Sequence, residues 1–318
     1  MQKLDLLDRR ILCELDLNAR IPASALAKKL HKSKETVNFR INRLLEGKCL
    51  KGFYAVFNTS GLGFYYYKIY FKLNSIHPGK EKEIFEYIAK QRRIAYLASM
   101  EGYYDGVFLI MAKSPTDLMA FLHPFMKLYG TCIREREIST FLSTHRFNQK
   151  FLYSGGAQAD WHYPYEMGNY PLGETDAKIL KSISSSARLP IVEIAKQAGI
   201  DAKRAQYRLK KLEKGGIILA YTTALDFGKL GLQFVQLNIS LNDPTAGRQM
   251  LSHFNSTNRC LFAIEMMGRY DLTIELHVEN NAQLQRIMAA FKEKFSSKCN
   301  ECDVSTITKE YVVIWGPF

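Results

Sequence analysis

The chain has 318 residues, of which 47% are hydrophobic and 24% charged. These proportions are typical of a soluble globular protein and exclude a disordered or fibrous chain. No stretch reaches the roughly 18 consecutive apolar residues that a membrane-spanning helix needs. The N-terminus has no apolar signal core, because charged residues interrupt it at once. We therefore expect a cytoplasmic protein of about two domains or one repeated unit.

The charge is positive and unevenly distributed. The formal net charge is +13; residues 1–150 hold 25 basic and 14 acidic side chains, and residues 151–318 hold 19 and 17. A positive balance of this kind favours a polyanionic partner such as nucleic acid or an anionic membrane surface.

Cysteine and histidine spacing predicts no metal site. The six cysteines are scattered except for Cys299 and Cys302, and a single C-x-x-C pair supplies too few ligands for structural zinc. We expect these two cysteines near the beginning of a strand. The seven histidines show no H-x-x-x-H spacing, and no G-x-S-x-G, P-loop or dinucleotide fingerprint is present. The sequence therefore predicts no catalytic residues and no cofactor.

An internal repeat organises the chain. A shift of 168 positions aligns residues 4–63 with residues 172–231 without a gap, and 14 of the 60 pairs are identical. A shift of 166 continues the match at Gly102/Gly268, Tyr104/Tyr270, Asp105/Asp271, Ser139/Ser305 and Thr140/Thr306. The two copies flank a Gly- and Pro-containing segment at 151–171, which predicts a linker. Its aromatic residues indicate that it packs along a surface.

The first sixty residues of each copy predict three short helices and an extended segment. An apolar stripe marks the first helix, Pro22 opens the second, and Ser33 is placed to cap the third. Gly47 is expected to end that helix as a C′ glycine, before an extended segment at 50–57. The second copy repeats the pattern with Pro190, Asp201 and Gly215 in the matching places. Such a succession predicts a winged helix-turn-helix.

The third helix of this motif lies in the DNA major groove, so its outward face should be polar and basic. Residues 1–54 hold 12 basic against 6 acidic side chains, and residues 172–221 hold 10 against 5. Asn38 and Gln206 occupy matching positions, and both amides can read adenine with two hydrogen bonds. The predicted DNA-binding residues are Ser33, Lys34, Asn38, Phe39, Arg40, Asn42, Arg43, Lys203, Arg204, Gln206, Tyr207, Arg208, Lys210 and Lys211.

The second part of each copy changes its periodicity. The first copy predicts strands at 64–74, 93–100, 107–112 and 132–142, with helices at 80–90 and 115–130. The second copy predicts strands at 234–241, 260–267, 272–278 and 303–314, with helices at 247–254 and 280–296. The order strand-helix-strand-strand-helix-strand is that of a ferredoxin-like fold. The fold class is therefore α+β, with each winged helix-turn-helix followed by a ferredoxin-like βαββαβ domain.

The module DLLDRRILCELDLNARIPASALAKKLHKSKETVNFRINRLLEGKCLKGFYAVFNTSGLG resembles the DNA-binding domain of the Lrp/AsnC family of transcription regulators. The following βαββαβ unit with its Gly-x-x-Asp turn resembles that family's regulatory domain, and family members are usually single-copy chains. We predict DNA-binding domains at 1–58 and 172–226 and regulatory domains at 62–150 and 230–318. The resemblance implies an amino-acid-like effector near Gly102, Tyr104, Asp105, Gly268, Tyr270 and Asp271.

Two other functions are left open by the sequence. The siroheme decarboxylases share the two-part architecture, so the fold alone does not exclude an enzyme. A ligand-sensing module without DNA contact is the other alternative, since a basic helix face is often only a solvated surface.

The linker also bears on assembly. It can span some tens of ångströms, and pairing within one chain should outcompete pairing between chains. We therefore expect one chain to be a pseudo-twofold equivalent of the family dimer, with residues 64–145 packed on 232–314. Larger assemblies remain open, a homodimer of chains first among them.

Overall fold

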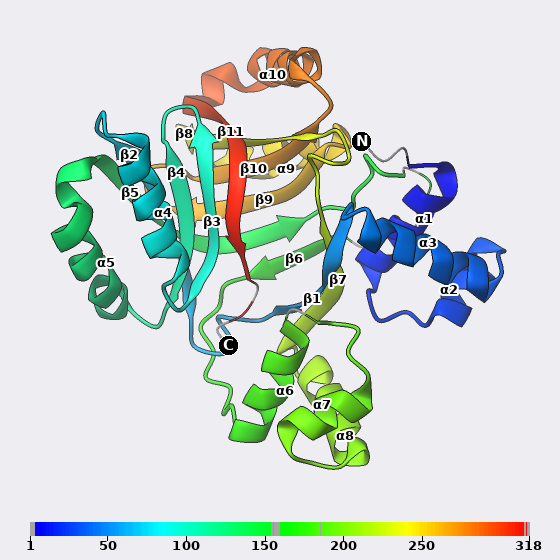
Figure 1. The fold of residues 1–318 in the computed structure, drawn as a ribbon. Helices are drawn as coiled ribbons and strands as arrows, with labels where there is room; N and C mark the ends of the chain where they lie inside the picture. The colour runs from blue at the N-terminus through cyan, green and yellow to red at the C-terminus, as the bar shows by residue number, and fades with distance from the viewer. Residues whose placement is uncertain (1–3, 154, 156–159, 185, 315, 317–318) are drawn as a thin grey trace.

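The computed structural model describes residues 4–153, 155, 160–184, 186–314 and 316 (Figure 1). Each half of the chain contains three helices and a strand, followed by two β-α-β units. Within the described ranges, no helix is both long and apolar enough to cross a membrane.

The first half contains the following elements in chain order: α1 (Leu6–Leu17), α2 (Ala23–Leu30), α3 (Lys34–Glu46), β1 (Leu50–Phe57), β2 (Tyr65–Leu73), α4 (Pro78–Ala89), β3 (Ile94–Glu101), β4 (Gly106–Ala112), α5 (Pro115–Tyr129), η1 (Gly130–Cys132) and β5 (Ile133–Arg146). After β6 (Trp161–Pro164), the second half contains α6 (Glu174–Ser184), α7 (Ile191–Ala198), α8 (Ala202–Lys214), β7 (Ile218–Leu225), β8 (Gln233–Leu241), η2 (Pro244–Ala246), α9 (Gly247–Ser256), β9 (Cys260–Met267), β10 (Leu272–Val278), α10 (Asn281–Phe295), η3 (Ser296–Lys298) and β11 (Cys299–Val313). Cys299 and Cys302 both lie at the beginning of β11, as expected, and both are free thiols.

The caps of the third helices confirm the sequence prediction at one end and correct it at the other. Ser33 Oγ accepts the Thr36 N–H at 3.1 Å, and the Asp201 carboxylate accepts the Arg204 N–H at 2.8 Å. Gly47 and Gly215 are not left-handed C′ glycines, because their φ angles are −71° and −78°. The left-handed residue follows one position later, and it is Lys48 in the first copy and Gly216 in the second, with φ of 56° and 66°.

Eight strands of the two halves form a closed hydrogen-bonded ring. The neighbours follow the order β5-β2-β4-β3-β11-β8-β10-β9, and β9 pairs with β5 again. Two long strands make the crossings between the halves. β5 pairs with β2 of its own half and then with β9, and β11 pairs with β8 of its own half and then with β3. The last strand of the first half was predicted to end at residue 142, but it continues to Arg146 because residues 140–146 pair with β9.

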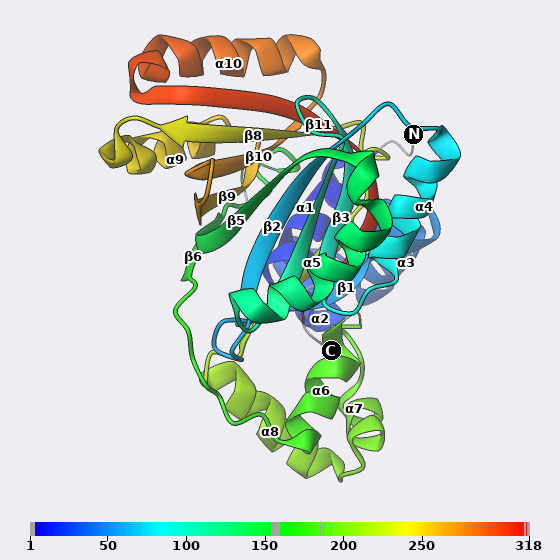
Figure 2. The same cartoon turned by 90° about the vertical axis from the view of Figure 1, so that its left-hand side faces the viewer.

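One hydrophobic core lies inside the ring, and two others lie on its outer faces. α4 and α5 cover the outer face of the first half, and α9 and α10 cover that of the second (Figure 2). The faces turned toward each other form a shared core, to which Tyr70, Met100 and Phe141 contribute from the first half and Leu261 and Tyr270 from the second. The expected packing of residues 64–145 on 232–314 within one chain is therefore present.

Residues near the local twofold axis differ between the halves. Tyr70 and Asn238 occupy matching positions in β2 and β8, 168 residues apart. The Tyr70 hydroxyl donates to Asn238 Oδ1 at 2.8 Å, and both side chains are fully buried. The same hydroxyl lies 3.3 Å from Thr273 Oγ1. The axis thus passes through a hydrogen bond between unlike residues.

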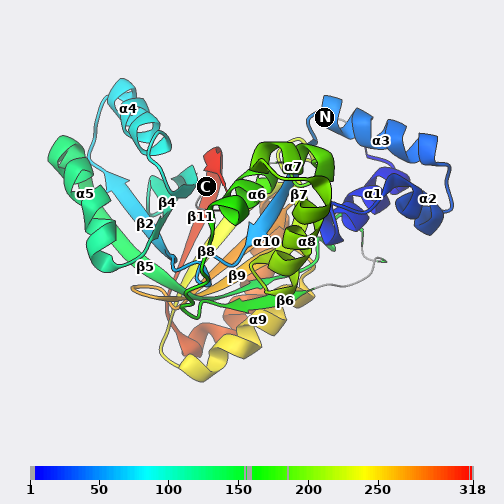
Figure 3. The ribbon, with the colours of Figure 1, turned by 90° about the horizontal axis from the view of Figure 1, so that it is seen from below.

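The two wings are paired and crossed. β1 and β7 form an antiparallel ribbon between the helical domains (Figures 1 and 3). β7 contacts α1 and β1 contacts α6, so each wing packs against the first helix of the other copy. Leu225 of β7 joins the core of the first helical domain, whereas Ala55 and Phe57 of β1 join that of the second. The ribbon therefore fixes the two helical domains relative to each other.

The predicted linker contains one strand of its own. β6 pairs with the end of β5, from Ser143↔Pro164 to Arg146↔Trp161. The Tyr163 side chain is buried, and its ring packs edge-on against Tyr165 at a centroid distance of 4.8 Å. The described part of the linker thus packs along the surface as expected, but as an ordered addition to the sheet.

Candidate nucleic-acid interface and internal cavity

The third helix of each helical domain turns a polar face to solvent. In α3 the inner stripe of Val37, Ile41 and Leu44 is buried, and in α8 Ala205 and Leu209 are buried in the same way. The predicted residues that are exposed are Ser33, Lys34, Asn38, Phe39, Asn42, Lys203, Arg204, Gln206, Tyr207, Lys210 and Lys211. The structure thus brings the expected polar and basic side chains together on two accessible helix faces.

Three of the predicted DNA-binding arginines are only partly exposed, because they make ion pairs within their own domain. Arg43 lies 2.5 Å from the buried carboxylate of Asp8. Arg40 contacts Asp5 and also lies 3.2 Å from Asp8. In the second copy Arg208 lies 2.9 Å from Asp176. These arginines tie the third helix to the first, a role that the sequence prediction did not include.

An exposed aromatic ring stands at the same position on each third helix. Phe39 is 64% exposed and Tyr207 is 69% exposed, and the two residues are 168 positions apart. Large aromatic side chains are usually buried, so two exposed rings at matching positions indicate a contact surface. Apolar side chains on a groove-binding helix can contact the methyl group of thymine.

The Gly-x-x-Asp turns lie where the two halves meet. A Cβ atom on Gly102 would collide with the Ser305 side chain, and one on Gly268 would collide with Ser139. Each glycine therefore packs against the serine of the opposite copy. This contact explains physically why both the Gly102/Gly268 pair and the Ser139/Ser305 pair match between the copies.

The polar groups of these turns already have partners in the protein. Asp105 Oδ2 accepts the Leu73 N–H at 2.7 Å, and Asp271 Oδ2 accepts the Leu241 N–H at 2.6 Å.

The tyrosines of the two turns, Tyr104 and Tyr270, are fully buried. Arg269 donates to the Tyr104 hydroxyl at 3.0 Å, and the Tyr270 hydroxyl donates to Asp303.

These partners give the turn residues a structural role. The aspartates fasten strand ends and the tyrosines fill the shared core, so an effector bound here would have to compete with those contacts. Effector binding by the turn residues stays a prediction.

An internal cavity of about 170 Å³ lies between the closed strand ring and the wing ribbon. Its wall includes Tyr54 of β1, Ala224 of β7, Lys68 of β2, Glu275 of β10 and Tyr163 of β6. Both wings, both βαββαβ halves and the linker therefore line one space. Most of the remaining wall is aromatic or aliphatic, which is typical of a small-molecule site.

Five charged residues line this cavity, and two of them, Lys68 and Glu275, carry opposite charges from different halves; the others are Lys51, Arg146 and Glu310. Lys68 is 2% exposed, and its ammonium lies 5.2 Å from the centre of the Tyr70 ring. Burial lowers the pKa of Lys68 to about 8 and raises the pKa of Glu275 to about 7. Attraction between the two charges opposes both shifts. Burying charged groups without hydrogen-bonding partners is costly, so such a pair favours a polar ligand or water between them.

A buried histidine forms another part of the wall. The His277 ring stacks on Phe227 at a centroid distance of 3.7 Å and lies 4.9 Å from Phe234. Burial lowers the pKa of His277 to about 3, so the ring is neutral at pH 7. Its Nδ1 atom has no hydrogen-bond partner among the described residues. This stacking among aromatic rings is typical of a structural histidine.

The charged residues of the cavity were not predicted from the sequence. A signal for Lys68 was present, because it interrupts the aromatic run of β2 at a position where both sheet faces are covered. Nothing in the sequence pairs it with Glu275, which lies in the other copy. The closed ring alone brings the two residues to one space.

Comparisons with known proteins agree with the two helical domains. An AsnC-type helix-turn-helix model matches residues 4–45, and a winged helix-turn-helix DNA-binding model matches residues 172–218. The chain is similar to the HTH-type transcriptional regulator FL11 of Pyrococcus furiosus, at 31% identity over 119 residues, 37% of this chain and 78% of the relative. It is also similar to the proline dehydrogenase transcriptional activator of Rhizobium radiobacter, at 26% identity over 140 residues, 42% of this chain and 86% of the relative.

A likeness over the full length exists at the level of the fold. The crystal structure of the siroheme decarboxylase NirDL superposes with a TM-score of 0.66 and 12% identity, covering 98% of this chain and 94% of that one. At such low identity the likeness shows the fold alone. The regulators, in contrast, match in sequence over most of their own length and less than half of this chain. With its two helix-turn-helix domains, this chain belongs to the Lrp/AsnC family of transcriptional regulators, in a tandem-duplicated form.

Proposed function

We propose that the chain is a sequence-specific DNA-binding regulator that reads two half-sites with α3 and α8. The observation that carries the proposal is the pair of exposed polar helices held on one scaffold by the crossed wing ribbon. Asn38 and Gln206 would read bases, and Lys34, Lys203, Lys210 and Lys211 would contact phosphates.

The two half-sites should differ in sequence. At matching positions the first helix offers Asn38 and Phe39, whereas the second offers Gln206 and Tyr207. Asn and Gln differ in reach, and the tyrosine hydroxyl adds a polar atom where phenylalanine has none. We therefore expect an imperfect palindrome, with the half-site spacing set by the ribbon.

Selection of bound fragments from random duplex DNA tests this function. The expected result is one enriched imperfect palindrome, with an affinity that falls steeply as salt rises. Lys210→Ala should lower the salt slope by about one, whereas Lys82→Ala on the exposed face of α4 should leave it unchanged. Binding without sequence preference, or no salt-dependent shift of duplex DNA, would contradict the proposal and favour a sensing module without DNA contact.

We infer that the βαββαβ units at 62–150 and 230–318 are ferredoxin-like regulatory domains. The strand order β5-β2-β4-β3 of the first unit and β11-β8-β10-β9 of the second support this inference. The boundaries 1–58 and 172–226 for the DNA-binding domains remain part of the same proposal.

We further infer that a small amino-acid-like effector modulates DNA binding from the internal cavity. Lys68 would bind its carboxylate and Glu275 its ammonium group. A volume of about 170 Å³ is below the roughly 300–1,000 Å³ of pockets for drug-sized ligands, so it favours a small molecule. Because Tyr54 and Ala224 of the wings line the cavity, an occupant would touch the ribbon that spaces the reading helices.

A panel of free amino acids tests the effector site. One of them should raise the melting temperature and change operator affinity, and Lys68→Met should abolish both effects. Lys82→Met on the surface of α4 is the matched control. If the amino acid still changed the melting temperature and operator affinity of Lys68→Met but not those of Asp105→Asn, the effector site would instead lie at the Gly-x-x-Asp turns.

An enzyme of the siroheme decarboxylase type is the second candidate. The full-length fold likeness to NirDL favours it, and a structure of that protein in complex with an iron-uroporphyrin III analogue superposes equally well, at a TM-score of 0.67. A tetrapyrrole is larger than most drug-sized ligands, so this cavity would have to enlarge to hold one. A shift of the tetrapyrrole absorbance on mixing with the chain would support the enzyme, and an unchanged spectrum would exclude it.

A further inference from the structure

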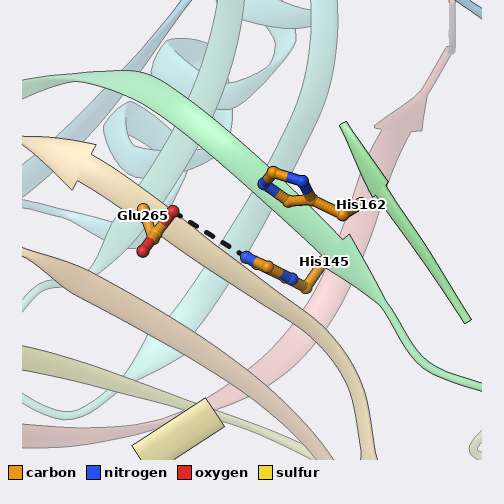
Figure 4. Close-up of side chains that lie close together, drawn as sticks. All are labelled: His145, His162 and Glu265. Atoms are coloured by element: carbon orange, nitrogen blue, oxygen red, sulfur yellow. Dashed lines mark ion pairs between the residues drawn. The ribbon is translucent and has the colours of Figure 1, made fainter. Parts of the chain in front are cut away.

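Three potential metal ligands meet on one face of the sheet. His145 lies on β5, His162 on β6 and Glu265 on β9 (Figure 4). One ligand atom from each residue lies within 4.8 Å of the other two. His145 stands directly opposite His162 in the β5–β6 register, and Glu265 is paired with Ser143, two residues from His145. Residues two apart on a strand share a face, so the backbone itself brings the three side chains together.

The cluster is accessible and partly organised. The His145 side chain is 24% exposed and that of Glu265 37%, while His162 is exposed. His145 Nε2 lies 3.8 Å from Glu265 Oε2, and the centroids of the two imidazole rings are 4.2 Å apart. The Ser143 hydroxyl donates to Glu265. A hydrogen bond of this kind fixes the orientation of a metal-binding carboxylate.

We propose that His145, His162 and Glu265 form a binding site for one divalent transition-metal ion per chain. Two imidazoles and one carboxylate suit Zn²⁺ and similar ions and do not suit Mg²⁺ or Ca²⁺, which prefer oxygen ligands alone. Three protein ligands leave a coordination position open for water.

The site occurs in one half only. The positions that match His145 and Glu265 in the other copy are Tyr311 and Ser99, which carry neither an imidazole nor a carboxylate. The second half therefore cannot build the same site from matching residues, and the expected stoichiometry is one ion.

The metal would fasten the linker to the sheet. β6 contacts the sheet through four residue pairs with β5, and the chain runs from β6 through nine residues to α6 of the second DNA-binding domain. An ion shared by β5, β6 and β9 would hold this connection in place. Metal binding would therefore stabilise the position of the second DNA-binding domain.

Calorimetric titration of the tag-free full chain with Zn²⁺ tests the proposal. One equivalent should bind, and His162→Ala should weaken the affinity by about tenfold or more. Even the loss of a residue that only hydrogen-bonds to a metal ligand typically lowers metal affinity by about that factor. Because His162 is exposed, its removal should leave the fold intact, which circular dichroism checks. His123→Ala, an exposed histidine on α5, is the matched control and should bind Zn²⁺ like the parent chain.

Two outcomes would overturn the proposal. The first is the absence of Zn²⁺ binding at pH 7.5, which would leave His145 and Glu265 as an ion pair alone. The second is binding that persists in His162→Ala but disappears in Cys299→Ser/Cys302→Ser, which would assign the ion to the thiols of β11. A visible absorption band of bound Co²⁺ without a sulfur charge-transfer band would support the histidine site.

Discussion

The two DNA-binding domains share one fold but are attached to the strand ring in different ways. In the first half, Asp16 of α1 accepts two hydrogen bonds from Arg146 of β5, at 2.6 and 2.8 Å, and both residues are buried. Gln149 and Thr222 donate to the same carboxylate. In the second half the matching positions hold Ser184 and Val312, which cannot form an ion pair.

The two copies of this duplicated protein have diverged in the contacts that attach their DNA-binding domains to the ring. The apolar contacts of the ribbon are present on both sides, with Leu225 in one helical core and Phe57 in the other. In addition to these shared contacts, the first half has the buried ion pair between Asp16 and Arg146, which we call the anchor and which ties α1 to the end of β5. We therefore expect the first DNA-binding domain to be held more rigidly than the second.

The largest effect should come from breaking this anchor. Arg146→Met leaves the Asp16 carboxylate buried without its cation, which typically destabilises a protein by about 3–5 kcal/mol. Chemical denaturation should show this loss, whereas Val312→Met at the matching position should change stability much less. The double variant Asp16→Leu/Arg146→Met should recover most of the loss. Equal losses at Arg146 and Val312 would show that the two attachments are equivalent.

The ion pairs between the first and third helices should differ between the copies. Asp8 has two arginine partners, Arg40 and Arg43, whereas Asp176 has Arg208 alone in the described part of the chain. Arg208→Ala should therefore cost about 1–3 kcal/mol, because a buried carboxylate loses its partner. Arg40→Ala should cost less, because Arg43 still pairs with Asp8. Thermal unfolding of both variants measures the difference, and a reversed order would refute this account.

The reading residues should act on different half-sites. Asn38→Ala should cost about 1–3 kcal/mol of operator affinity, mainly through the half-site that α3 reads. Gln206→Ala should have a similar effect on the other half-site. Competition binding with operators mutated in one half measures both effects, and Glu35→Ala, beside the reading face of α3, is a control for helix perturbation. Identical responses of both half-sites to Asn38→Ala would contradict separate reading by α3 and α8.

The smallest effect concerns the residue after each third helix. Lys48 has a φ of 56° where the second copy has Gly216. Lys48→Gly should raise the free energy of unfolding by about 0.5–1 kcal/mol, because relief of the left-handed strain outweighs the greater freedom of glycine in the unfolded chain. Gly216→Lys should lower it by a similar amount. Urea denaturation of the two variants measures both changes, and a destabilising Lys48→Gly would show that the lysine side chain makes a compensating contact.

Local features were predictable from the sequence because each depends on neighbouring residues. The helix stripes, the Ser33 and Asp201 caps and the strand at 50–57 follow from periodicity and capping chemistry. The left-handed position was misplaced by one residue, because Gly47 has a φ of −71° and the left-handed residue is Lys48.

Features that join distant segments were not predictable. The continuation of β5 onto β9 depends on the register between the two copies, which neither strand specifies alone. His145 and His162 are 17 residues apart and Glu265 is in the other copy, so no motif spacing connects them. The aspartates of the Gly-x-x-Asp turns illustrate the same limit, because their backbone partners Leu73 and Leu241 become neighbours only in the folded sheet.

The hydrogen bond between Tyr70 and Asn238 has an evolutionary consequence. In a homodimer, a residue on the symmetry axis always meets its own identical copy, so only self-compatible side chains can stand there. Fusion of the two copies into one gene removes that restriction, and a donor and an acceptor can then be selected separately on the two sides. A half that carries only Tyr70 or only Asn238 would place two identical side chains on the axis of a symmetric dimer and would lose this hydrogen bond.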